Sequence, residues 1–242
     1  MRNKKKFKFK TPKRKQPVYS FFRPILSRLA TKKIEVINLN EEISDKCIFV
    51  GNHEGKKGPL IYEKYLPKFL CPWGAYQMLG GYVDRYKYLR NVLYIQKLGK
   101  GKFSATLKSA FEAIFSILIY RGIKVIPSFP DARLIKTLNY STGVLDNNMA
   151  VMVYPEDSNN GYLVEPPKFF NGFVMLGEYY YKKRGEDVPV YPTYLSLKSK
   201  KLVIGKPLFI NELKNQGLSK DEVAERFRQE VINLYHNYIK NK

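Results

Sequence analysis

Histidine is the side chain best suited to take a proton from a hydroxyl near neutral pH, and the chain has two, His53 and His236. His53 follows a strand-like apolar run at residues 47–50 and lies among glycines at positions 51, 55 and 58. A loop of this kind can present an imidazole to a substrate, so His53 is the candidate general base. On position alone a structural role stays open. His236 lies in a predicted C-terminal helix and is interpreted as structural.

A second strand-like run, at residues 150–154, ends in Pro155-Glu156-Asp157. A glutamate at the end of a buried strand either caps a helix or pairs with a lysine, or it contacts the hydroxyls of a substrate. Both interpretations of Glu156 are open at this point. The glycines near His53 lack the spacing of a phosphate-binding loop, so they are interpreted as turn formers.

Strand-like and helix-like segments alternate along the chain, except at residues 60–94, whose pattern is mixed. Strand character lies at residues 34–37, 47–50, 123–126, 150–154, 188–197 and 201–204, and helical spacing at 104–120, 134–145, 172–183 and 219–240. Ser219 and Glu222 form a capping box at the start of the last helix. The alternation predicts an α/β fold with a central mixed sheet flanked by helices. We expect one domain over residues 17–242, after a basic tail at residues 1–16.

The charge balance restricts the partners that the chain can have. It contains 43 Lys and Arg against 21 Asp and Glu, a formal net charge of +22, together with 19 Tyr and 15 Phe. Such a surface attracts polyanions, which include nucleic acid, an anionic membrane and phosphorylated substrates. The two cysteines, Cys47 and Cys71, lack metal-ligand spacing and favour a reduced cytoplasmic setting.

No transmembrane helix and no signal peptide are expected. The most apolar run, residues 113–120, is flanked by Glu112 and Arg121 and is shorter than the ~20 residues that a span needs. The basic residues 2–15 form either a solvated tail or a tether to anionic lipid. The amphipathic residues 18–29 either pack on the domain or dip into lipid. A cytoplasmic protein of this kind would meet a membrane as a peripheral or monotopic protein.

Several short motifs occur in a fixed order. Phe49-Val50-Gly51-Asn52-His53 is a strand that leads into Asn-His. A glycine followed by a strand-like run comes next, at 122–126. An apolar strand then leads into Pro-Glu at 151–156, and Lys168 and Gly172 follow it. The last two motifs are a strand with two prolines at 188–192 and a Gly-x-Pro turn at 205–208. The ordered set resembles the glycerolipid acyltransferase superfamily, of which lysophosphatidate and glycerol-3-phosphate acyltransferases are typical. The resemblance extends from about residue 18 to the C-terminus.

The resemblance implies an O-acyltransferase of phospholipid biosynthesis with a glycerol-3-phosphate acyltransferase-like fold. His53 would be the base on the hydroxyl of a lipid-like acceptor, which attacks the thioester of acyl-CoA or acyl carrier protein. The His53 and Glu156 loops would lie at one edge of the sheet. The acceptor side would include Glu156 and Ser158, with Lys168 and Arg133 near it. Neither a metal nor a bound cofactor is implied, because the thioester is already activated.

The chain departs from the family pattern beside the histidine. The family places an aspartate five residues after the histidine, where it orients and charges the imidazole, and here that position is Gly58. An active enzyme should draw this carboxylate from Asp157, Glu54 or Glu63, of which Asp157 is the first choice. A Gly58→Asp substitution is expected to raise activity or leave it unchanged.

The two arginines with which the family binds phosphate are also displaced. Ser128 stands where the second motif has one of them, the nearest arginine is Arg133, and Glu156 is followed by Asp157 rather than by Gly-Thr-Arg. Two alternatives therefore stand beside the acyltransferase. One is a catalytically impaired member of the family that binds lipid or a partner enzyme. The other is a basic nucleic-acid-binding protein, which only the net charge favours.

Overall fold

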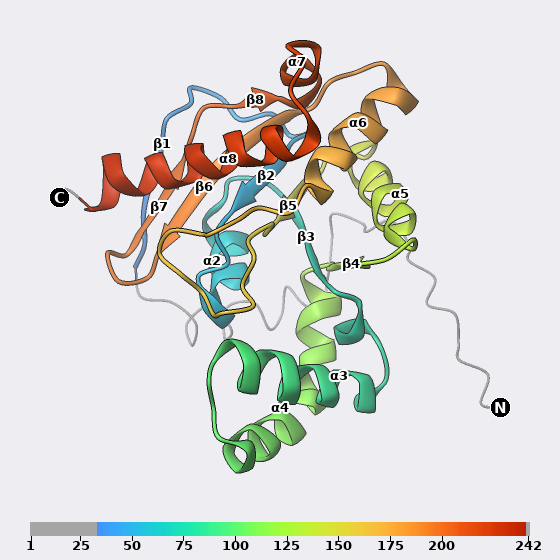
Figure 1. Ribbon diagram of the computed structural model, residues 1–242, viewed down its shortest axis with the longest axis vertical. Helices are drawn as coiled ribbons and strands as arrows, with labels where there is room; N and C mark the ends of the chain where they lie inside the picture. Colours follow the sequence, from blue (N-terminus) through green and yellow to red (C-terminus); the bar gives the residue numbers. More distant parts are fainter. Residues whose placement is uncertain (1–32, 241–242) are drawn as a thin grey trace.

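The computed structural model of the protein describes residues 33–240, which are built around one eight-stranded sheet (Figure 1). The strand order is β1-β7-β6-β2-β5-β3-β4, and β8 pairs with β6. The strands are β1 Glu35–Asn38, β2 Ile48–Gly51, β3 Leu70–Ala75, β4 Ile126–Ser128, β5 Ala150–Val153, β6 Pro189–Ser196, β7 Lys201–Ile204 and β8 Leu208–Phe209. All pairs are parallel except β6 with β7 and β6 with β8. The predicted α/β fold with a central mixed sheet is confirmed.

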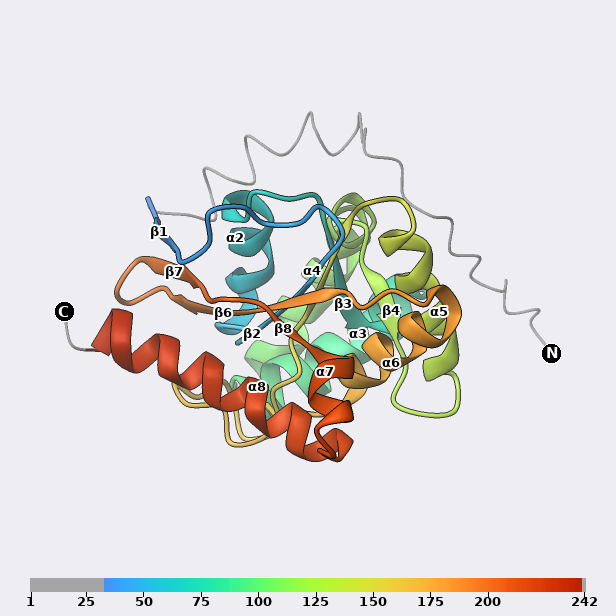
Figure 2. The same ribbon diagram turned by 90° about the horizontal axis from the view of Figure 1, so that it is seen from above.

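Helices cover both faces of this sheet. The helices are α2 Gly58–Tyr65, α3 Tyr82–Tyr88, α4 Lys102–Gly122, α5 Leu134–Leu145, α6 Gly172–Arg184, α7 Ile210–Asn215 and α8 Lys220–Tyr235. Short 3-10 segments lie at η1 Gly55–Lys57 and η2 Tyr76–Leu79, and π-helical segments at η3 Leu89–Lys97 and η4 His236–Lys240. Figure 2 shows α2 on one side of the sheet and α6 and α8 on the other.

Alternation along the strands divides the core into two apolar clusters. In β2, Ile48 and Val50 belong to the cluster that α6 and α8 cover, and Phe49 belongs to the cluster that α2 covers. Successive side chains of a strand point to opposite faces, so a strand that is apolar throughout can be buried on both. β2 is therefore buried on both faces, and it fixes the position of Asn52 and His53, which follow it directly.

Most of the predicted elements are present. The helix α5 and the strand β7 have the predicted bounds, and Ser219 caps α8 by accepting from the backbone of Glu222. The predicted strand at 123–126 is instead β4, Ile126–Ser128, because α4 continues to Gly122. The strand β3, which is paired on both sides, was not predicted, since its Pro72 removes a backbone donor and its Gly74 weakens strand character.

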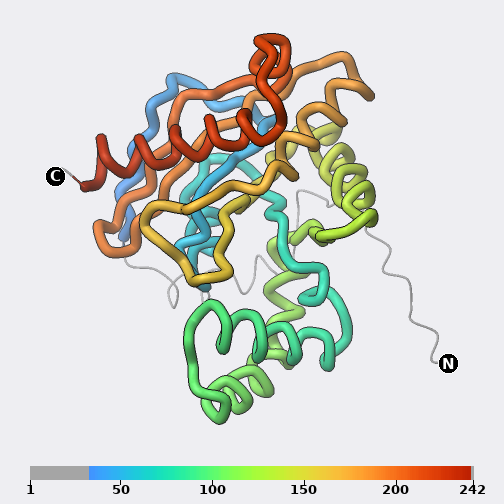
Figure 3. The backbone as a smooth tube through the Cα atoms, in the orientation of Figure 1, coloured from blue at the N-terminus to red at the C-terminus, as the bar shows by residue number. Residues whose placement is uncertain are grey.

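Residues 76–122 leave the sheet after β3 and return to it at β4, and we call them the α3–α4 lobe. They comprise η2, α3, η3 and α4, which extend away from the sheet (Figure 3). The lobe has its own small core, made of Met78, Leu89, Tyr94, Ala105 and Ala113. The basic tail at 1–16 and the amphipathic segment at 18–29 lie outside the described residues.

Candidate active site around His53

Two neighbouring parallel strands bring His53 and Glu156 together. His53 comes two residues after the end of β2, and Glu156 three residues after the end of β5. Because the carboxyl ends of parallel strands lie at one edge of a sheet, the two loops meet there. The backbone N–H of His53 donates to Oε1 of Glu156 at 3.0 Å. The expected placement of both loops at one sheet edge agrees with this contact.

Asn52 fixes the start of the histidine loop. Its side-chain amide donates to the carbonyl of Leu195 at 2.9 Å, and its Oδ1 accepts from the N–H of Leu195 at 2.9 Å and from the hydroxyl of Tyr62 at 3.0 Å. Asn52 is buried, and this set of bonds uses both its donor and its acceptor. An asparagine before the histidine therefore extends the pairing of β2 with β6 by one residue through its side chain.

The imidazole of His53 is oriented by a backbone carbonyl. Its Nδ1 lies 2.6 Å from the carbonyl oxygen of Gly55. A carbonyl oxygen can only accept, so Nδ1 carries the proton of the neutral ring and Nε2 carries the lone pair. Within residues 33–240 the hydrogen bonds of His53 go to Gly55 and Glu156, which leaves Nε2 without a protein partner.

Two tyrosines enclose the imidazole. The ring of Tyr162 stacks on His53 with centroids 5.0 Å apart, and the ring of Tyr154 lies at 4.8 Å. The pKa of His53 is lowered to about 4, mainly by burial; the hydrogen bond to Gly55 opposes this shift and the nearby charge of Lys97 adds to it. The ring is consequently neutral near pH 7, which is the protonation state of a base, although its basicity is low.

Gly58 is held in place by the loop that it closes. It is the first residue of α2, and a Cβ added there would lie 1.8 Å from the carbonyl oxygen of His53 and 2.8 Å from its carbonyl carbon. Both of these atoms are backbone atoms, so relief would require the histidine loop itself to move. The structure thus argues against the expectation that Gly58→Asp raises activity or leaves it unchanged.

Two of the three carboxylates expected to replace the missing aspartate accept hydrogen bonds from backbone N–H groups. Glu54, in a left-handed conformation, accepts from the backbone N–H of Leu197 at 2.7 Å. Asp157 accepts from the N–H of Asn159 at 3.1 Å, within its own loop. Glu63 lies on α2. The group that holds Nδ1 of His53 is the backbone carbonyl of Gly55.

Lys97, which sequence patterns did not identify, joins the site from the end of η3. Its Nζ donates to Oγ of the buried Ser158 at 2.6 Å and lies 5.5 Å from the ring centroid of Tyr162. Burial lowers the pKa of Lys97, and the charges of Glu156 and Asp157 oppose this effect. An ammonium group therefore faces the residues that follow β5. It lies in no recognised motif, so no local signal marked it.

Two of the expected acceptor-side residues lie outside this group. Lys168 is exposed, and it contacts the loop after β5 through its backbone carbonyl, which accepts from the N–H of Asp157 at 2.9 Å. Arg133 follows β4, two strands from β5, and forms a two-pronged ion pair with Asp131 at 2.9 and 2.6 Å. Glu156 thus contacts His53 and Ser158 contacts Lys97, whereas the side chains of Lys168 and Arg133 lie outside this group.

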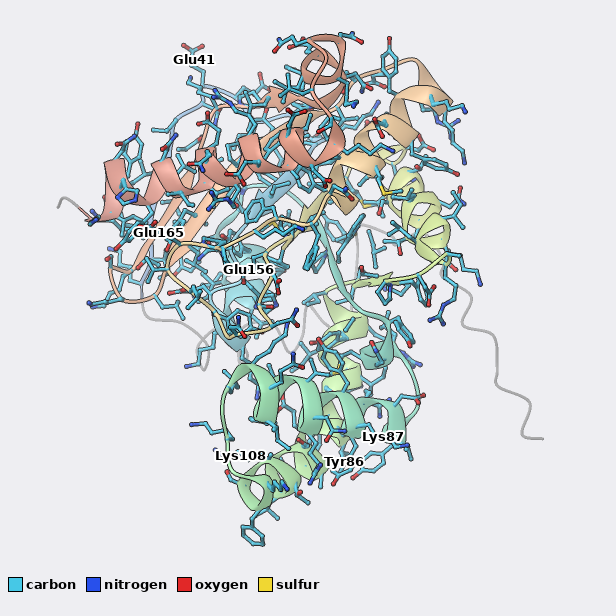
Figure 4. All side chains as sticks on the ribbon, in the orientation of Figure 1. Glu41, Tyr86, Lys87, Lys108, Glu156 and Glu165 are labelled. Atoms are coloured by element: carbon cyan, nitrogen blue, oxygen red, sulfur yellow. The ribbon has the colours of Figure 1, made fainter. Side chains whose placement is uncertain are left out.

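Glu156 is a buried acid whose protonation is sensitive to pH. Only 7% of its surface is exposed. Burial raises the pKa of Glu156 to about 7, while the N–H of His53 and the charge of Lys97 oppose this rise. In the view of Figure 4 it lies between the sheet and the α3–α4 lobe. The carboxyl group can therefore gain or lose a proton near neutral pH.

These groups suit the deprotonation of a hydroxyl beside an anionic group. Nε2 of His53 can accept a proton, and Lys97 can bind an anion. Residues 33–240 contain no cluster of three His, Cys, Asp or Glu side chains that could hold a metal ion.

We compared the chain with models of protein families and with curated protein sequences, and it matches none of them.

Proposed function

We propose that the protein transfers an acyl chain from a thioester, acyl-CoA or acyl carrier protein, to a hydroxyl of a lipid-like acceptor. The fold would then be of the glycerol-3-phosphate acyltransferase type. The observation that carries the proposal is the 2.6 Å contact between Nδ1 of His53 and the carbonyl of Gly55, because it leaves Nε2 free to act as the base. The resemblance of residues 49–53 to the family's Asn-His motif supports the same role.

In the proposed reaction, Nε2 of His53 accepts the proton of the acceptor hydroxyl while the oxygen of that hydroxyl attacks the thioester carbonyl carbon. The tetrahedral intermediate then collapses, the C–S bond breaks, and the leaving thiolate takes the proton from Nε2. The ring is positive between these two steps. The carbonyl of Gly55 keeps its hydrogen bond throughout, but a neutral carbonyl stabilises the positive ring less than a carboxylate would.

Lys97 supplies the cation that the displaced arginines would otherwise provide. Its Nζ contacts Ser158, immediately after the strand and loop that carry Glu156. A lysine binds phosphate as a point charge and lacks the two-pronged geometry of arginine. The acceptor that fits this arrangement carries one anionic group close to its hydroxyl.

The direct test is His53→Gln, with His236→Gln as the matched control. His236 lies on η4, where Nε2 is 3.0 Å from Glu165, so its replacement leaves the site intact. Each variant is assayed for acyl transfer from acyl-CoA and acyl carrier protein to phosphorylated and unphosphorylated hydroxyl acceptors. We expect only His53→Gln to lose transfer while both variants keep the circular dichroism of the wild type. Transfer at the wild-type rate by His53→Gln would refute the role of His53 as the base.

A second candidate is a protein of this fold that binds lipid without transferring an acyl chain. The observation that favours it is the low pKa of His53, about 4, in a ring that has no carboxylate on Nδ1. A wild-type protein that is silent with every donor and acceptor, but still binds lipid, would place this candidate first.

A further inference from the structure

The helix α4 has its small side chains inside and its large apolar side chains outside. Its buried positions are Ala105, Ser109, Ala113 and Ser116. Five large apolar side chains recur on the other side every three or four residues, and each is more than half exposed: Phe103, Leu107, Phe111, Ile114 and Leu118. A helix of a water-soluble domain shows the opposite arrangement.

Neighbouring side chains widen this surface. Phe115 of α4 and Tyr82 and Val83 of α3 are exposed as well. The hydroxyl of Tyr82 donates to the carbonyl of Ala110 at 3.2 Å, which holds α3 beside this part of α4. We call these eight exposed side chains the α4 apolar face. Monomeric soluble proteins rarely expose a contiguous apolar patch larger than roughly a few hundred Å², and larger ones mark contact with a membrane or another protein.

The charge of the lobe favours an anionic partner. Residues 76–122 contain eight basic side chains against two acidic ones, Asp84 and Glu112. Arg85 is buried and Lys97 belongs to the site around His53, which leaves six for a partner: Lys87, Arg90, Lys100, Lys102, Lys108 and Arg121. Both carboxylates accept hydrogen bonds within the protein: Asp84 accepts from the N–H of Gly81, and Glu112 accepts from the side chains of Lys56 and Tyr94. Figure 4 labels Lys87 and Lys108 on this lobe. Apolar side chains surrounded by lysine and arginine are typical of segments that bind the surface of an anionic bilayer.

We propose that the α4 apolar face docks on an anionic membrane, with its aromatic and aliphatic side chains in the lipid and the surrounding basic side chains at the headgroups. The proposal names the surface from which the acceptor of the proposed function would arrive. It concerns binding alone, so its test needs no acyl transfer and can fail independently of the role of His53.

The helix lies along the membrane plane in this proposal. By length and composition α4 could cross a bilayer, in contrast to the expectation from its eight-residue apolar run. However, Glu112 and Lys108 lie near its middle, and Glu112 pairs with Lys56 of the histidine loop at 2.7 Å. A spanning helix would place both charges in hydrocarbon and break this ion pair.

Docking in this orientation would bring the lobe, the histidine loop and the lipid together. The loop of His53 is tied to α4 through Lys56 and Glu112, and η3 of the lobe carries Lys97 to Ser158. An acceptor that leaves the bilayer beside the lobe would then have a short path to Nε2. A site that faces away from the membrane would not have this advantage.

The test compares a double variant, Leu107→Gln with Phe111→Gln, with the control Ile135→Gln in the full chain. Ile135 is an exposed apolar residue of α5, outside the lobe. Binding is measured by sedimentation with phosphatidylcholine vesicles that contain phosphatidylglycerol, at physiological salt. Because loss of one buried large apolar side chain weakens partition about tenfold, we expect a loss of roughly a hundredfold for the double variant. The control should bind like the wild type.

A second measurement locates the contact. Tryptophan placed by Phe111→Trp should be quenched by brominated lipids in the vesicles, and tryptophan placed by Ile135→Trp should not. Wild-type binding by the double variant, or equal quenching at both positions, would overturn the proposal. A wild-type dimer that the double variant converts to a monomer, with unchanged vesicle binding, would also overturn it and assign the face to a second copy of the chain.

Discussion

Replacing Glu156 by glutamine should stabilise the protein at pH 8 and leave its stability unchanged near pH 4. Burial raises the pKa of Glu156 from its ordinary value of 4.5 to about 7. The folded protein therefore holds this proton more tightly than the unfolded chain does. The stability that the protonated group contributes is complete below pH 4.5 and is lost as the pH rises through 7. Glutamine is neutral at every pH and keeps an oxygen that can accept from the N–H of His53.

The size of the effect follows from the pKa. One pKa unit is worth about 1.4 kcal/mol, so a rise from 4.5 to about 7 corresponds to a cost of about 3 kcal/mol for the charged form. At pH 8 the wild type bears this cost and the Glu156→Gln variant does not. At pH 4 the carboxyl is protonated in the folded and in the unfolded chain, so the two proteins should unfold at the same denaturant concentration.

The assay is urea unfolding of both proteins at pH 4, 5, 6, 7 and 8, with the free energy of unfolding compared at each pH. The low pKa of His53 lowers the stability of both proteins alike as the pH falls from 6.5 through 4, so it cancels in the difference. Glu156→Asp keeps a titrating carboxyl and should keep the pH dependence. A glutamine variant that gains no stability at pH 8, or gains the same amount at pH 5, would refute the reasoning.

Three further outcomes are expected. Gly58→Ala should unfold at a lower temperature and lose acyl transfer, because its Cβ would lie 1.8 Å from the carbonyl oxygen of His53. The control Gly101→Ala has open space around it and should resemble the wild type, so equal melting temperatures of the two variants would contradict this reasoning. Lys97→Gln should raise the KM for phosphorylated acceptors about tenfold or more and leave that for unphosphorylated ones nearly unchanged, whereas an equal change for both would exclude phosphate binding. Removal of residues 1–15 should weaken binding to anionic vesicles, most at low salt, and equal binding to neutral and anionic vesicles would disprove an electrostatic tether.

Local patterns were sufficient to predict much of the fold. Helical spacing predicted α5, and Ser219 with Glu222 predicted the start of α8, because both signals depend on residues only three or four positions apart. The pairing of the His53 and Glu156 loops was also expected. The resemblance implied that both loops lie at one edge of the sheet, and in the structure the two strands that precede them are parallel neighbours.

The rest depends on contacts that no local pattern encodes. The partner of His53 is a backbone carbonyl, so its presence depends on the path of the loop rather than on a residue type. Lys97 reaches Ser158 across 61 positions of the chain. The strand β3 contains Pro72, which normally argues against a strand that is paired on both sides. The helix α4 was predicted, but which of its faces is exposed depends on how the lobe packs.

The contact between Gly58 and His53 restricts how this site could change by mutation. A substitution of this one glycine is enough to place a carboxylate five residues after the histidine in the sequence, but the first carbon of the new side chain would overlap the carbonyl of His53. A mutant could acquire the aspartate only after the turn between the two residues had been rebuilt, for example by an insertion or deletion. The glycine thus separates this site by more than one mutational step from a site with a histidine and an aspartate five residues apart, and the intermediate step would lose the loop that holds the histidine.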